Sequence, residues 1–165
     1  MRLTMTGLLV CALALPGVSA VAHAEPTQLP LISVTTIPDG WSQRTDLRPI
    51  LQVFADGDAV HSPDAVSKDR KPETAPEKVS GTVSADVISA ARAEIEALAE
   101  VDFGIPAGEG KGTKIIDLMP ADADGEAHLV VYSPDATEGL NADQQAARKR
   151  FADLSEKLVD AFEKD

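Results

Sequence analysis

Two segments of this chain carry apolar residues at helical spacing, and this pattern limits its fold more than any other feature. The first segment begins after Ser84, a typical helix N-cap, and ends near Val101. The second opens with Asn141 and Gln144, which match a capping box. Each apolar stripe must pack against another element, because an amphipathic helix has to bury one face. The stripes are Val87, Ile88, Ala91, Ile95 and Leu98 in the first segment and Ala147, Phe151, Leu154, Leu158 and Phe162 in the second.

Short runs rich in β-branched residues supply that element. Turn residues bound several of them, most clearly Pro38-Asp39-Gly40 and Asp56-Gly57. We expect an α+β fold in two layers, a mostly antiparallel sheet packed by two amphipathic helices. The last two runs are almost continuously apolar, which predicts that both faces are at least partly covered there. The runs cover residues 31–37, 50–55, 59–61, 79–83, 114–119 and 127–132.

Residues 62–77 interrupt this pattern. Three prolines stand there among charged and small residues, and the segment offers almost nothing to bury, so we expect a mobile loop. The sequence shows no internal repeat. It therefore predicts a single domain over residues 31–165, preceded by a short tail at 25–30.

The first 24 residues have the layout of a secretory signal peptide. Arg2 precedes the apolar run 7–15, and Ala22-His23-Ala24 fits a cleavage site, with Ala20-Val21-Ala22 as a second register. The run is shorter than the ~20 residues needed to span a bilayer, so we expect cleavage near Ala24 and no stable membrane span. Cys11 is an alternative lipidation site, but Val10 precedes it and apolar sequence follows. The expected location is secreted, extracellular or associated with the cell envelope.

Charge argues against nucleic acid as a ligand. Cleavage after Ala24 leaves 141 of the 165 residues and removes one basic residue, so the formal net charge changes from −12 to −13. An acidic surface of this kind repels phosphate backbones. The basic clusters 68–71 and 148–150 lack the neighbouring aromatic residues that stack on single strands. The processed chain also has no cysteine, because Cys11 is the only one.

Four pieces of the sequence resemble a group of secreted or lipid-anchored actinobacterial proteins of unassigned function. They are the stretch 51–57 ending in Ala55-Asp56-Gly57, the loop 102–106 after the first helix, the strand end Val131-Tyr132, and residues 140–148. Members of that group have an ADG hairpin, a YG-x-P loop and a final helix opening like LTPEQQAAR. Phe103 stands here where that loop has Tyr. The resemblance covers roughly residues 47–159 and implies an envelope or extracellular location, with no catalytic residue to carry over.

The sequence contains few of the residue patterns that are typical of catalytic sites. The processed chain has two histidines, His61 and His128, and no Gly-x-Ser-x-Gly elbow. A small hydrolase or carbohydrate-active enzyme using carboxylates, with His61 or His128 assisting, stays an alternative because the chain has 27 acidic residues. We assign no catalytic, cofactor-binding or metal-binding residue.

Two further stretches resemble ligand loops only in part. The stretch Asp122-x-Asp124-Gly125-Glu126 offers oxygen ligands close together, but the glycine comes at the fourth place and not at the sixth, as in an EF-hand. A hairpin turn is therefore the preferred interpretation and a calcium-stabilised domain the alternative. The glycine-rich residues 108–112 mimic a phosphate loop, although a strand and not a helix is expected to follow. A flexible connector is the preferred interpretation there.

The leading hypothesis is an exported, non-enzymatic module that binds an envelope or extracellular protein. The predicted contact surfaces are the 62–77 loop and the segment around Trp41, because long loops on a rigid scaffold often carry function. Trp41 is alternatively a lid over one end of the core, since a lone tryptophan tends to bury most of its area. The sequence fixes neither the partner nor the oligomeric state.

Overall fold

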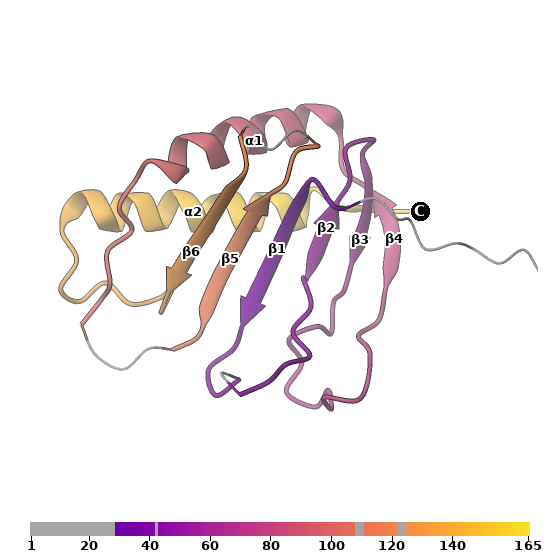
Figure 1. Cartoon of the computed structure of the whole chain (residues 1–165), viewed down its shortest axis with the longest axis horizontal. Helices are drawn as coiled ribbons and strands as arrows, with labels where there is room; N and C mark the ends of the chain where they lie inside the picture. Colours follow the sequence, from indigo (N-terminus) through magenta and orange to yellow (C-terminus); the bar gives the residue numbers. More distant parts are fainter. Residues whose placement is uncertain (1–28, 42, 108–110, 122–124) are drawn as a thin grey trace, which may run out of the picture.

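The computed structural model of the chain has two layers (Figure 1). It describes residues 29–41, 43–107, 111–121 and 125–165. One layer is a seven-stranded sheet in which every neighbouring pair is antiparallel. The other layer holds helices α1 (Ala85–Ala99) and α2 (Ala142–Asp160). The predicted two-layer α+β fold is confirmed.

The strand order in the sheet is β6-β5-β1-β2-β3-β4-β7. The long connection between β4 and β5 contains α1, and it brings β5 beside β1 instead of beside β4 (Figure 1). Every run predicted as a strand lies on one. The strands are β1 (Ile32–Ile37), β2 (Leu51–Val53), β3 (Asp58–His61), β4 (Val79–Thr82), β5 (Thr113–Leu118), β6 (Ala127–Tyr132) and β7 (Glu163–Lys164).

The core lies between the sheet and the two helices. Alternate residues of each long strand point toward the helices, so Val34, Ile116 and Leu129 are buried in register with one another. The predicted apolar stripes meet them: Ile95 of α1 and Phe151 of α2 are both almost fully buried. Burial of each such side chain contributes roughly 1.5–3 kcal/mol before the entropy cost is counted.

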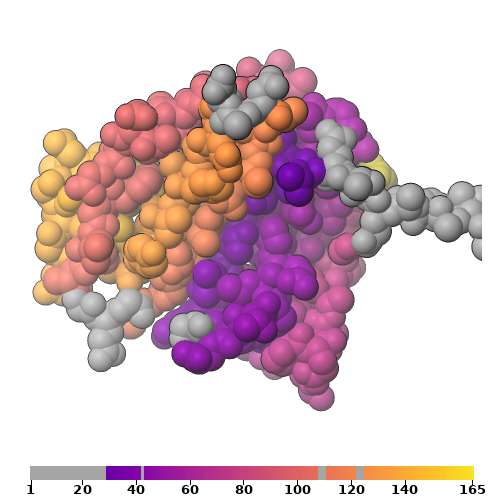
Figure 2. Space-filling view, in the orientation of Figure 1, coloured from indigo at the N-terminus to yellow at the C-terminus, as the bar shows by residue number. Residues whose placement is uncertain are grey.

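Both helices pack on the same face of the sheet, and no helix of the described residues lies on the opposite face, called the open face here (Figures 1 and 2). The burial of β6 alternates as a result, and Tyr132 on the open face is 55% exposed. We expected both faces of β5 and β6 to be at least partly covered. On the open face, no helix of the described residues supplies that cover. Ile115 and Val130, opposite each other on the open face, are half-buried.

The two helix starts differ in how they are capped. Asn141 accepts a hydrogen bond from the Gln144 amide (2.9 Å), and the Gln144 side chain accepts one from the Asn141 amide (3.1 Å). This confirms the predicted capping box. Ser84 is the N-cap of α1, as expected, but its side chain makes no capping hydrogen bond. The α1 start thus lacks the stabilisation that a capping hydroxyl supplies.

The C-terminal strand β7 is a feature that the sequence did not predict. It pairs two exposed residues with β4, placing Lys164 opposite Gly81 and Glu163 opposite Thr82. A Cβ atom on Gly81 would lie 2.2 Å from the Glu163 carbonyl oxygen and 2.6 Å from the ring of Phe162. Glycine at position 81 is what allows this close approach. Phe162, expected at the end of the α2 stripe, lies beyond the helix and packs against His61 with 5.2 Å between ring centroids.

The expected signal peptide and most of the tail, residues 1–28, lie outside the described residues. Leu29 at the start of the described chain is exposed. Among the helices that the structure describes, none has the length and apolar character needed to cross a bilayer.

Candidate functional site

Trp41 lies on the β1–β2 connection, just after the predicted Pro38-Asp39-Gly40 turn. The turn closes with a hydrogen bond from the Trp41 amide to the Pro38 carbonyl (3.2 Å). The Arg44 guanidinium stacks on the indole, 3.8 Å from the ring centroid. The indole is half-buried and is not among the residues packed against the hydrophobic core. The structure therefore places Trp41 on an arginine and not over the core, contrary to the lid interpretation.

The 62–77 loop is organised around Arg70, which is only 7% exposed. Its guanidinium donates to the carbonyls of Ala65 (3.1 and 3.2 Å) and Thr74 (2.9 Å), so one side chain ties together both arms of the loop. Ala65 is also buried. The expectation that this segment has almost nothing to bury is wrong at these two positions. Its predicted mobility stays a prediction.

Arg70 also joins the loop to the Trp41 segment. Its Nη1 atom lies 2.8 Å from a carboxylate oxygen of Asp46, and its guanidinium lies 5.6 Å from the indole centroid. Arg44 donates to the Arg70 carbonyl (3.0 Å) and holds both oxygens of Asp46 in a two-pronged ion pair. The two surfaces predicted separately from the sequence thus form one unit. We call Trp41, Arg44, Asp46 and residues 62–77 the Trp41 lobe.

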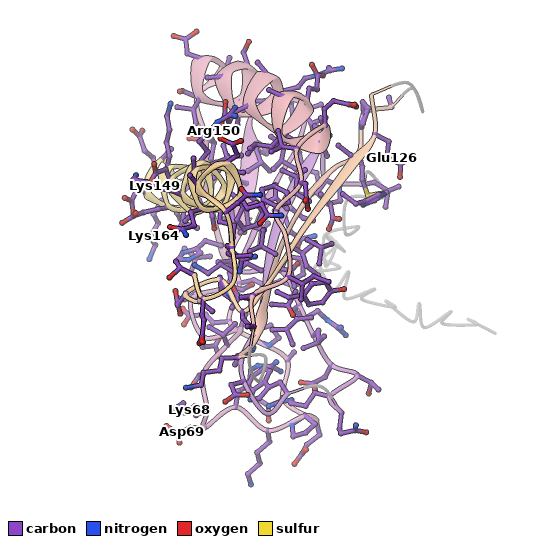
Figure 3. All side chains as sticks on the ribbon, turned by 90° about the vertical axis from the view of Figure 1, so that its left-hand side faces the viewer. Lys68, Asp69, Glu126, Lys149, Arg150 and Lys164 are labelled. Carbon is purple, nitrogen blue, oxygen red and sulfur yellow. The ribbon has the colours of Figure 1, made fainter. Side chains whose placement is uncertain are left out.

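The hydrogen bonds inside the lobe favour the ionised form of Asp46. The hydrogen bonds from Arg44, with further help from Arg70, hold the pKa of the Asp46 carboxyl far below its usual range. Asp46 in turn raises the pKa of Arg44, mainly through the same hydrogen bonds. The outer end of the lobe is charged and exposed: Figure 3 shows Lys68 and Asp69 at the end of the molecule opposite α1. The lobe therefore has an interior held by the ion pairs of Asp46 and an outer end, at Lys68 and Asp69, that is exposed to solvent.

The two histidines considered for catalysis do not form a common site. His61 pairs with Leu51 on the helix-facing side of the sheet, whereas His128 pairs with Asp117 on the open face. Strands β5, β1 and β2 separate them, a distance of roughly 19 Å at ~4.8 Å per strand. A catalytic arrangement that uses both imidazoles is excluded by this geometry.

His128 instead belongs to a polar row across three strands. Its Nδ1 atom lies 2.8 Å from an Asp117 oxygen, and its Nε2 atom lies 3.1 Å from Glu126. Ser33 of β1 donates to the other Asp117 oxygen at 3.2 Å. The hydrogen bond with Asp117, followed by that with Glu126, raises the pKa of His128. The serine contacts the aspartate and not the histidine, so the row lacks the nucleophile–base contact of a catalytic triad.

Three of the four motif pieces that carry the family resemblance meet at Arg148. This side chain is 5% exposed, and it donates to the carbonyls of Phe103 (3.2 Å), Gly104 (3.4 Å), Tyr132 and Ser133 (2.6 Å). The Arg148 Nε atom has no hydrogen-bond partner among the described residues. Burial lowers the pKa of the Arg148 guanidinium. Arg148 thus joins α2, the end of β6 and the loop after α1. The motif residues around Arg148 therefore form a packing centre.

Ser133 takes an unusual conformation at this centre, with a φ of +46°. The hydroxyl accepts a hydrogen bond from the Lys111 amide (2.9 Å), while the carbonyl accepts from Arg148. Residues in strained backbone conformations cluster at active sites, so a serine in the left-handed region is a candidate catalytic nucleophile. Because its hydroxyl is buried and bonded to backbone, and both histidines lie on other parts of the sheet, we interpret this conformation as a means of aiming the carbonyl at Arg148.

Parts of the two loops that resemble ligand sites lie outside the described residues, namely 108–110 and 122–124. After the first of these segments β5 begins at Thr113, so a strand follows, as expected. Beyond the second, Gly125 has a φ of +93° and the β5–β6 pairing closes at Leu118 and Ala127, which fits the expected hairpin. In the described ranges, no group of three or more His, Cys, Asp or Glu residues is placed to hold a metal ion.

Three surface hollows of about 270–290 Å³ lie away from the Trp41 lobe. One is between the helices, beside the ion pair of Glu94 with Arg150 (2.8 Å). Another borders β3 and β4 near Asp165, and the third lies beside Lys111 and Ser133. Neither histidine lines any of the three.

Sequence analysis did not identify Arg70, Asp46 or Arg148 as organising residues. In the sequence, Arg70 belongs to the basic cluster 68–71 and Arg148 to the basic cluster 148–150, and such clusters usually lie on the surface. Helical spacing gives one indication for Arg148. It stands three residues before Phe151 and therefore lies on the same, buried side of α2. No such periodicity exists in the 62–77 loop, so nothing local distinguished Arg70 from its charged neighbours.

Comparisons of the chain with protein families, curated proteins and solved structures gave no match.

Proposed function

We propose that this protein is an exported, non-enzymatic interaction module that uses the Trp41 lobe to bind another protein of the cell envelope or extracellular space. The proposal includes membership of the actinobacterial group that its motifs resemble, and export by cleavage near Ala24. Its contact partner is a protein and not a nucleic acid, in keeping with the acidic chain.

The observation that carries the proposal is the bracing of a long, charged loop against the chain's lone tryptophan. Arg70 is buried under its own loop, donates to the carbonyls of Ala65 and Thr74, and pairs with Asp46 at 2.8 Å, so it ties both arms of the loop to the Trp41 segment. Ordering a loop before binding reduces the entropy that a partner would otherwise have to offset. Trp41 is half-buried beside it, and tryptophan and arginine are the residues that most often dominate protein interfaces.

The alternative of a small hydrolase receives less support from the geometry. His61 and His128 occupy opposite faces of the sheet, and both ring nitrogens of His128 lie within hydrogen-bond distance of carboxylates, those of Asp117 and Glu126. No described observation favours catalysis by scattered carboxylates over binding.

Crosslinking in the native producer tests the proposal. The tagged protein is crosslinked in living cells, and the captured proteins are identified by mass spectrometry. We expect one dominant partner, captured by the wild type and at least tenfold less by Trp41→Ala, on the order of 1.4 kcal/mol of lost binding. Absence of a dominant partner for a folded, exported protein contradicts the proposal.

Two further variants separate binding from folding. Lys68→Glu combined with Asp69→Lys reverses the charges at the lobe tip without changing the net charge, and both side chains are exposed. This variant should fold normally and lose capture. Ile105→Ala, which shortens an exposed side chain of the loop after α1, should retain it. Equal capture by all variants would show that the lobe is not the contact surface.

A further inference from the structure

We draw no further inference here: the strongest candidate, the surface patch of Ile115, Val130 and Tyr132 on the open face of the sheet, is covered by no helix of the described residues, and nothing in the structure shows which segment, second copy or partner would cover it.

Discussion

Gly104 lies directly against the side chain of Gln144, so that a Cβ atom on Gly104 would stand 2.6 Å from the Gln144 Cδ atom. The same Gln144 side chain closes the capping box of α2 and donates to Asp102 at 2.8 Å. Asp102 in turn accepts from the Gly104 amide (2.8 Å), and both hydrogen bonds lower the pKa of its carboxyl. One glutamine therefore fixes both the start of α2 and the loop after α1.

Gly104→Ala should destabilise the fold, for two separable reasons. The φ of +60° strains any residue with a Cβ atom, and the methyl group would collide with Gln144. We expect a loss of about 1–3 kcal/mol in the free energy of unfolding, measured by urea denaturation. Gly40→Ala isolates the first reason, because Gly40 has a φ of +78° and open space around it.

The collision itself is tested by a double-mutant cycle. Gln144→Ala removes the obstacle, so the cost of Gly104→Ala should be smaller in that background than in the wild type. If the two costs instead add within about 0.5 kcal/mol, the contact between Gly104 and Gln144 is not what excludes alanine.

Local patterns predicted the elements well because each had a local cause. The DG turn after Phe54 needed a glycine at positive φ, and Gly57 has a φ of +96°. The capping box needed Asn141 and Gln144 at their spacing, and both hydrogen bonds form. These causes act over a few residues, so one sequence suffices to identify them.

Long-range contacts escaped prediction for the opposite reason. Strand β7 forms because a glycine more than eighty residues earlier leaves room for it, and nothing in Glu163 or Lys164 indicates a strand. The Trp41 lobe depends on Arg70 meeting Asp46, 24 residues away across a hairpin. A charged residue in a loop looks the same in sequence whether it faces water or is buried with partners.

Arg148→Met should be among the most destabilising substitutions in the chain. Methionine fills similar space but leaves four carbonyls without their donor, including those of Phe103 and Ser133. We expect a loss of roughly 3 kcal/mol in the free energy of unfolding. Arg150→Met is the control, because Arg150 is exposed and its ion pair among the described residues is with Glu94 on the surface, and it should leave stability nearly unchanged. Similar stabilities for the two variants would show that Arg148 is not a packing centre.

Gly81→Ala should displace the C-terminal strand. The methyl group would overlap the Glu163 carbonyl and the Phe162 ring, so β7 has to leave β4. Hydrogen exchange should become faster at Asp165, whose amide donates to the Ser80 carbonyl, and at Thr82, which by the alternation of antiparallel pairs also faces β7, with a stability loss of about 1–3 kcal/mol. In a chain truncated after Ala161 the obstacle is gone, and the same substitution should be nearly neutral. An equal cost in both chains would locate the clash elsewhere.

The His128 row predicts a stability that depends on pH. Asp117 and Glu126 raise the folded-state pKa of His128 above the ordinary value of 6.5. Protonation is therefore favoured by folding: its stabilising contribution is fully present below pH 6.5 and is lost as the pH rises through the folded-state pKa. Denaturation of the wild type should show this loss above pH 6.5, and Asp117→Asn should flatten it. A wild-type profile that His128→Gln leaves unaltered would contradict this assignment.

Arg70→Met tests how the 62–77 loop is held, and with it the predicted mobility. In the wild type, Arg70 joins the carbonyls of Ala65 and Thr74, so the loop should exchange its amides slowly for a surface segment rich in proline. The variant removes those bonds and the ion pair with Asp46, and exchange within 62–77 should accelerate by tenfold or more while the β1–β5 ladder is unchanged. Equally fast exchange in both proteins would mean that the loop is mobile despite Arg70. In that case the Trp41 lobe would order only on binding, and partner affinity would be insensitive to Arg70→Met.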